Sequence, residues 1–103
     1  MRRLRKGLRN QGRKNRLRGR RDENHKAIVE GLRQYGATVQ DLGDVGGGCP
    51  DILVGWRGRN YLIEIKRDSK AKLNKTQENW HAGWKGSVYK CHTLGHVLRD
   101  INR

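Results

Sequence analysis

Two short apolar runs separated by a polar turn constrain the fold of residues 50–66 more than any other feature of the chain. The first run, residues 52–54, reads Ile-Leu-Val, and the second, residues 61–63, reads Tyr-Leu-Ile. Such β-branched and aromatic residues favour strands, and the Arg-Gly-Arg-Asn segment at 57–60 is typical of a turn. We therefore predict that the two runs pair as a β-hairpin.

Charged residues border both runs of this hairpin. Asp51 follows Pro50 and opens the first run, while Glu64 and Lys66 end the second. Side chains alternate faces along a strand, so Glu64 and Lys66 point to the same side, where pairing also brings Asp51. Two carboxylates and an ammonium group can hold a hard divalent cation and position a nucleophilic water. The pattern predicts a metal-dependent hydrolase site.

Each part of this pattern also has a simpler interpretation. An acid after proline is often a turn residue, and a Glu-x-Lys pair on an exposed strand is often solvated surface. The combination is more specific, because both acids border very apolar runs, where an uncompensated charge is costly. The three glycines at 46–48 permit positive φ or close approach of another backbone. They form either a flexible linker or a rim of the site that is open to a substrate.

Positive charge is concentrated at the N-terminus. The 103 residues carry a formal charge of +14, from 24 Lys and Arg against 10 Asp and Glu. Residues 1–21 contain eleven of these bases and no acid, which leaves the rest of the chain nearly balanced. The eleven are Arg2, Arg3, Arg5, Lys6, Arg9, Arg13, Lys14, Arg16, Arg18, Arg20 and Arg21. With so few apolar residues among them, we expect an arm that is disordered alone and binds a polyanion.

Nucleic acid is the partner that such an arm indicates, because neutralised phosphates release their counter-ions. A targeting signal or a membrane-surface segment is the alternative, but no stretch has the apolar length of a signal peptide or a spanning helix. We expect no membrane partner and no organic cofactor. Cys49 and Cys91 do not form a metal-ligand spacing with each other or require an oxidising compartment, so a cytoplasmic location is the default. The pair Cys91-His92 is expected at a strand end.

Hydrophobic periodicity predicts one α/β domain. A helix begins with Asp22 as N-cap and ends before Gly36. A short strand over residues 37–42 and the hairpin follow, and Asn74 then caps a second helix that ends at Trp84. The order closes with a strand at 87–91 and a helix at 94–101, giving helix, three strands, helix, strand, helix. We divide the chain into an arm, 1–21, and a domain, 22–103.

The three tryptophans are large for so small a domain. We expect at least two of Trp56, Trp80 and Trp84 to pack in the core. A self-complementary patch around the third would make a homodimer.

These segments, taken in order, resemble the PD-(D/E)XK nuclease superfamily, and within it the small VRR-NUC or Holliday-junction-resolvase-like nucleases of phages and bacteria. The matching residues are Asp22-Glu23-Asn24-His25, Gly48-Cys49-Pro50-Asp51, Glu64-Ile65-Lys66, and Gln77 with Trp80 and Trp84. The resemblance covers residues 22–103 and implies an αβββαβ restriction-endonuclease-like core with a mixed central sheet. It also implies DNA as substrate, with branched or flap structures as candidates, and host cytoplasm as the location of a phage-encoded protein.

The resemblance further implies roles for particular residues. Asp51, Glu64 and the backbone carbonyl of Ile65 would bind Mg²⁺ or Mn²⁺, and Lys66 would orient the attacking water, either as a base or as an electrostatic clamp. Gln77 would lie near the metal or the substrate backbone, although an exposed helical residue is the simpler interpretation. Many relatives place a glutamate on the first helix. Here that position falls near Asn24, so either Glu23 is a third acid or Asn24 coordinates through its amide oxygen.

Three functions compete at this stage. The first is a Mg²⁺-dependent DNA endonuclease whose arm grips backbone phosphates without reading bases. The second is a non-catalytic nucleic-acid-binding module, in which the acids have only a structural role. The third, an RNA-associated structural protein, leaves the arrangement of Asp51, Glu64 and Lys66 unexplained.

Overall fold

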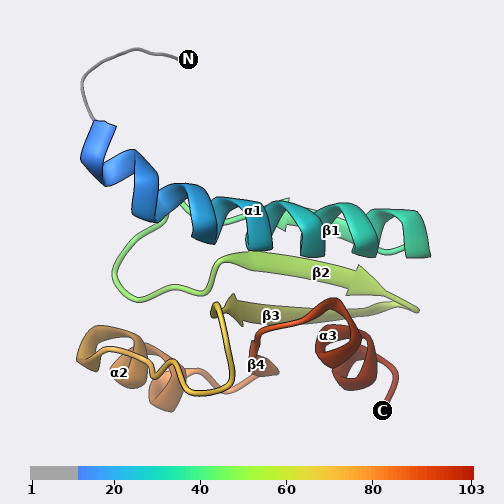
Figure 1. The fold of residues 1–103 in the computed structure, drawn as a ribbon. Helices are drawn as coiled ribbons and strands as arrows, with labels where there is room; N and C mark the ends of the chain where they lie inside the picture. The colour runs from blue at the N-terminus through green and yellow to red at the C-terminus, as the bar shows by residue number, and fades with distance from the viewer. Residues whose placement is uncertain (1–11) are drawn as a thin grey trace.

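The computed structural model describes residues 12–103, with side chains from residue 23 onward. Its elements are α1 (Gly12–Tyr35), β1 (Thr38–Asp41), β2 (Ile52–Trp56), β3 (Arg59–Ile65), α2 (Lys75–Gly83), β4 (Val88–Cys91) and α3 (Leu94–Ile101) (Figure 1). The four strands form one sheet in the order β1-β2-β3-β4. The first two pairings are antiparallel and the third is parallel. The α/β class, the element order and the mixed sheet are therefore as predicted.

The first helix begins ten residues earlier than predicted. We expected Asp22 to be its N-cap, but α1 starts at Gly12, so this prediction was wrong. The intervening Arg, Lys and Leu residues are strong helix formers and no proline interrupts them, so the helix can continue into the basic segment. Six of the eleven predicted DNA-binding bases, from Arg13 to Arg21, are on α1. The other five, from Arg2 to Arg9, lie outside the described residues.

The predicted hairpin is present, with a tighter turn than expected. β2 and β3 are joined by Arg57 and Gly58 alone, both with positive φ (53° and 77°), which is the geometry of a type I′ turn. The four-residue turn over 57–60 was therefore wrong. Ile52 pairs with Ile63. The ladder ends at this pair, and the backbone N–H of Asp51, the residue before Ile52, donates to the carbonyl of Ile63 at 3.1 Å, which holds Asp51 beside the end of β3.

One face of the sheet carries the hydrophobic core, which α1 and α3 cover. Buried residues of the sheet pack there with side chains of both helices: Ile52, Val54, Ile63, Ile65 and Cys91 with Ile28, Leu32, Val97 and Ile101. The two helices approach closely at Gly31, where an added Cβ would lie 2.5 Å from a methyl carbon of Leu94. None of the helices in the described part of the chain has the length and apolarity needed to cross a bilayer.

The tryptophans are less buried than predicted. Trp56 packs against the edge of the core, 4.9 Å from the ring of Tyr35. Trp80 and Trp84 stack on each other at 4.8 Å on α2, which has no buried residue, and Trp84 is 46% exposed. The expectation of two core tryptophans was therefore wrong. Because α2 is short and lies at the surface, its aromatic stripe packs on itself instead of entering the core.

Candidate active site

Asp51 and Glu64 lie at the same end of β2 and β3. Ile63 and Ile65 face the core, so Glu64 leaves β3 on the other side, and Asp51 lines the same cavity as Lys66 and Gln77, the two partners of Glu64. Asp51 Oδ2 accepts a hydrogen bond from the backbone N–H of Ile65 at 2.7 Å, which fixes the direction of the carboxylate. Glu64 is 1% exposed, an unusual degree of burial for an acid.

The pKa of the Cys49 thiol reflects the negative charge at this end of β2 and β3. Burial raises its pKa, and the nearby carboxylates of Glu64 and Asp51 raise it further. A thiolate there would face two like charges, so the neutral form is favoured. The two carboxylates therefore make the electrostatic potential negative beside the start of β2, where a cation would be stabilised.

Lys66 is connected to Glu64 directly and through Gln77. The Lys66 ammonium lies 3.8 Å from Glu64 Oε2 and donates to Gln77 Oε1 at 2.9 Å. The amide nitrogen of Gln77 in turn donates to Glu64 Oε2 at 3.0 Å. Glutamine serves here because its amide offers an acceptor to the cation and a donor to the anion. The simpler interpretation of Gln77 as an exposed helical residue does not hold.

Helix capping holds Gln77 in this position. Asn74 is the N-cap of α2, as predicted, and its side chain accepts from the backbone N–H of Gln77 at 2.9 Å. The Gln77 side chain accepts in return from the backbone N–H of Asn74 at 3.0 Å. This reciprocal pair is a capping box, which immobilises the first turn of a helix. The same glutamine thus starts α2 and bridges Glu64 to Lys66.

The glycine run at 46–48 packs against the first turn of α2. Gly46, Gly47 and Gly48 all have positive φ, as the run was expected to permit. An added Cβ on Gly48 would lie 2.5 Å from the backbone oxygen of Thr76, so only glycine lets the loop approach the first turn of α2 this closely. This contact sets the position of α2 relative to Asp51, three residues further along.

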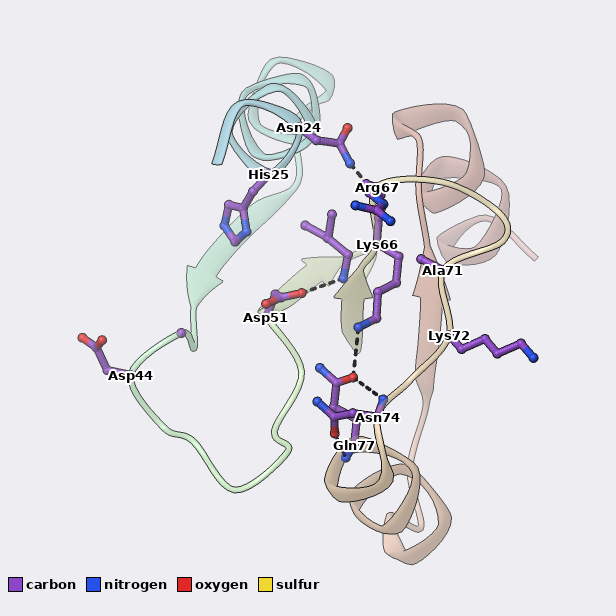
Figure 2. A pocket seen from close by; sticks show the side chains of 12 residues that line it. Asn24, His25, Asp44, Asp51, Lys66, Arg67, Ala71, Lys72, Asn74 and Gln77 are labelled. Carbon is purple, nitrogen blue, oxygen red and sulfur yellow. Dashed lines mark hydrogen bonds between the residues drawn. The ribbon is translucent and has the colours of Figure 1, made fainter. Parts of the chain in front are cut away.

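A cavity of about 910 Å³ opens over these groups (Figure 2). Five predicted site residues line it: Asn24, Asp51, Ile65, Lys66 and Gln77. Figure 2 shows the Lys66 side chain extending to Gln77 on α2, with Asp51, just before β2, to one side of it. Glu64 is buried and does not itself line the cavity, but it contacts two residues that do, Lys66 and Gln77.

The first helix contributes Asn24 to the cavity. Its amide nitrogen donates to the backbone carbonyl of Lys66 at 3.1 Å, which ties α1 to the end of β3. Glu23 is exposed and is not among the residues that line the cavity. Of the two alternatives for this helix, Asn24 is therefore the one that the fold brings to the site.

Several cavity residues were not predicted from the sequence. His25 lines the cavity, and its Nε2 lies 3.6 Å from a carboxylate oxygen of Asp41. Arg67 and Lys72 add positive charge from a segment that was interpreted only as a surface connection. Adjacency in the sequence could have indicated two of them, because His25 follows Asn24 and Arg67 follows Lys66. His81, one turn beyond Gln77, has its pKa lowered by burial and by the charge of Lys66.

Comparison with known proteins agrees with this geometry. No family model and no curated protein matches the sequence. A solved structure described as a VRR_NUC domain superposes with a TM-score of 0.67 at 25% identity, over 82% of this chain and 96% of the other. The fold is that of a VRR_NUC domain. The VRR_NUC fold belongs to the PD-(D/E)XK nuclease superfamily, so the resemblance seen in the sequence is confirmed, and the likeness indicates a nuclease.

Proposed function

We propose that this protein is a divalent-metal-dependent endonuclease that hydrolyses phosphodiester bonds in DNA. The observation that carries the proposal is that Asp51, Lys66 and Gln77 line one cavity, with Glu64 hydrogen-bonded to Gln77 and ion-paired with Lys66. The VRR_NUC fold supports the same function independently of these residues.

The residues present fit a hard cation. Asp51, Glu64 and the carbonyl of Ile65 would supply only oxygen ligands, which Mg²⁺ and Mn²⁺ prefer. When bound, the ion would lower the pKa of a coordinated water and neutralise charge that develops on the phosphate.

The other groups hold the site in order. Lys66 lies 3.8 Å from the Glu64 carboxylate and is held by Gln77, so we assign it the clamp role: it orients the attacking water and stabilises the phosphate oxygens. Gln77 bridges the side chains of Lys66 and Glu64 and keeps them close together. Asn24 fixes the backbone of Lys66, and we propose it as a positioning residue; a shift of its amide oxygen toward the ion would make it a ligand.

The basic residues would supply non-specific affinity for DNA. Arg67 and Lys72 continue the positive charge at the cavity, and the eleven bases of residues 1–21 would contact backbone phosphates. Branched or flap DNA is the substrate class that the family resemblance suggests. A homodimer would allow two strands to be cut together.

The test is cleavage of a panel of labelled DNAs: single strand, linear duplex, flap and four-way junction, each with Mg²⁺, Mn²⁺ or EDTA. We expect cleavage only with a divalent ion, and Asp51→Asn and Glu64→Gln to reduce it by about 10³-fold or more, because transition-state charge is then left without its counter-charge. Glu78→Gln is the matched control. Glu78 is an exposed acid beside Gln77 on α2 and should behave as wild type.

Binding must be measured beside cleavage, because the rival is a binding module without catalysis. In Ca²⁺, the inactive Asp51→Asn protein should still bind DNA, with a salt dependence set by the basic residues. Replacing the five bases from Arg2 to Arg9 by glutamine should flatten that salt dependence. Metal-independent binding together with no cleavage of any DNA by the wild-type protein would favour the rival.

A further inference from the structure

A second cluster of metal-ligating groups lies between β4 and α3. Cys91 ends β4, while His96 and Asp100 stand one helical turn apart on α3. The sulfur of Cys91 lies 3.4 Å from Asp100 Oδ2, and His96 Nε2 lies 3.8 Å from the same oxygen. All three ligand atoms lie within 4.8 Å of one another. Cys91 and Asp100 are 1% and 4% exposed, whereas the His96 side chain is 23% exposed and leaves a way in from solvent.

Two of these separations are close to the edges of a zinc coordination tetrahedron. With ordinary zinc bond lengths, sulfur and oxygen ligands lie about 3.5 Å apart, and nitrogen and oxygen ligands about 3.3 Å apart. The observed 3.4 Å and 3.8 Å compare well with these values, while the sulfur and the imidazole nitrogen lie within 4.8 Å of each other, so a metal ion requires the His96 ring to move toward Cys91. One thiol, one imidazole and one carboxylate form a donor set that suits zinc and related transition metals better than magnesium.

Neighbouring side chains orient two of the three ligands, His96 and Asp100. The Nδ1 atoms of His92 and His96 lie 3.3 Å apart, so one ring donates to the other. When His96 Nδ1 is the donor, its Nε2 lone pair faces Cys91 and Asp100, as a metal ligand requires. The second oxygen of Asp100 lies 3.3 Å from a guanidinium nitrogen of Arg103 and 3.6 Å from one of Arg99. Both ligands are therefore oriented by second partners, which is usual in metal sites.

The cluster is separate from the hydrolytic site. β3 and β4 pair Ile65 with Cys91 and Glu64 with Lys90. Cys91 therefore shares the core face with Ile65, and Glu64 leaves from the other face. An ion held by Cys91 would lie across the sheet from one held by Glu64.

We propose that Cys91, His96 and Asp100 form a zinc-class metal site, with water in the fourth position, that fastens α3 to the end of β4. This site goes beyond the nuclease function and does not depend on it. Without the metal, the Cys91 thiol donates to Asp100, and burial followed by this hydrogen bond raises its pKa to about 12. Zinc would replace that thiol proton.

The test titrates the metal-free, tag-free full chain with Co²⁺ and then Zn²⁺. We expect a cobalt absorption band from sulfur-to-metal charge transfer that saturates at one ion per chain, since an ion on the oxygen ligands near Asp51 gives no such band. We also expect Zn²⁺ to raise the thermal midpoint further when Mg²⁺ is already saturating. Cys91→Ser and His96→Gln should weaken Zn²⁺ binding by about 100-fold, while His92→Gln, an outer partner, should weaken it by about tenfold. Cys49→Ser is the matched control and should bind as wild type.

The alternative is that Cys91 and Asp100 form only a buried hydrogen bond. Absence of the charge-transfer band in the folded wild-type protein would overturn the proposal, and so would Zn²⁺ affinity unchanged in both Cys91→Ser and His96→Gln. Loss of binding in Cys49→Ser alone would place the ion beside Asp51 instead and would equally overturn it. Because His96 is partly exposed, His96→Gln should fold even where a change at buried Cys91 does not.

Discussion

Gln77→Ala removes the connection between the two charges of the site and the start of α2. The substitution deletes three hydrogen bonds at once: the amide donor to Glu64, the acceptor for Lys66, and the acceptor for the backbone N–H of Asn74. These three bonds differ in how well water can replace them. Glu64 has 2% of its side chain exposed and Lys66 has 14%, whereas Asn74 is exposed.

The expected loss of stability follows from that difference. A hydrogen bond to a buried charged group contributes about 1.5 to 3 kcal/mol, and Glu64 loses its donor where water has little access. The bond to Lys66 and the capping bond face the cavity or solvent, so water replaces much of each and they add about 0.5 kcal/mol apiece. The free energy of unfolding should therefore fall by about 2.5 to 4 kcal/mol, a large part of the stability of a small domain.

Urea denaturation followed by tryptophan fluorescence measures this loss, with two controls to locate it. Asn74→Ala removes the capping side chain without touching the charges, so it should cost only about 1 kcal/mol. Gln34→Ala removes an exposed glutamine of α1 and should change little. Gln77→Glu keeps both acceptors but sets a second acid against Glu64, so its stability should recover as acid protonates one of the two carboxyl groups.

The reasoning would be refuted by a Gln77→Ala protein as stable as Asn74→Ala. The capping box would then account for the whole effect, and the bridge between Glu64 and Lys66 would contribute nothing. A cycle combining Gln77→Ala with Lys66→Ala provides a second check. Additive losses would show that the two residues are not coupled.

Three further predictions follow from other parts of the structure. Gly48→Ala should destabilise the protein by at least about 1 kcal/mol more than Gly47→Ala, because both have positive φ but only the first would press a Cβ against Thr76; equal urea midpoints would contradict this. The pKa of His81 is lowered from its ordinary value of 6.5, so its contribution to the free energy of unfolding should be constant above pH 6.5 and should decrease as the pH falls below 6.5. His81→Gln should reduce this dependence in denaturation curves between pH 5 and 7. Trp84→Ala should convert a dimer to a monomer in sedimentation velocity, and a wild-type monomer at every concentration would end the dimer proposal.

Local patterns predicted the hairpin and the groups around it. The apolar runs, the strand alternation and the position of Asp51 before the first run were enough to bring Asp51 to the same end of the hairpin as Glu64, because pairing register is fixed by which side chains must be buried. Asn74 was also visible as a cap, since capping depends on residues three apart. The start of α1 was missed because a strong cap signal at Asp22 was given more weight than the helix-forming residues before it.

Contacts between distant segments could not be predicted in the same way. Gln77 was expected near the site only from family resemblance, and its bridge between Glu64 and Lys66 depends on how α2 packs. His92 and His96 are four residues apart, a spacing that the sequence analysis overlooked. Even with that signal, Asp100 would not have been paired with Cys91, since their approach requires α3 to lie against the end of β4.

The sequence by itself determined the α/β class, the order of strands and helices, and the two acids with their lysine on one side of a hairpin. These features follow from periodicity and pairing, which act over a few residues. Tertiary structure alone decided that Asn24, rather than Glu23, faces the cavity, that a glutamine joins the charges, and that a thiol, an imidazole and a carboxylate meet behind the sheet. The physical reason is that these groups come from separate elements, and their distances are set only when those elements pack around one core.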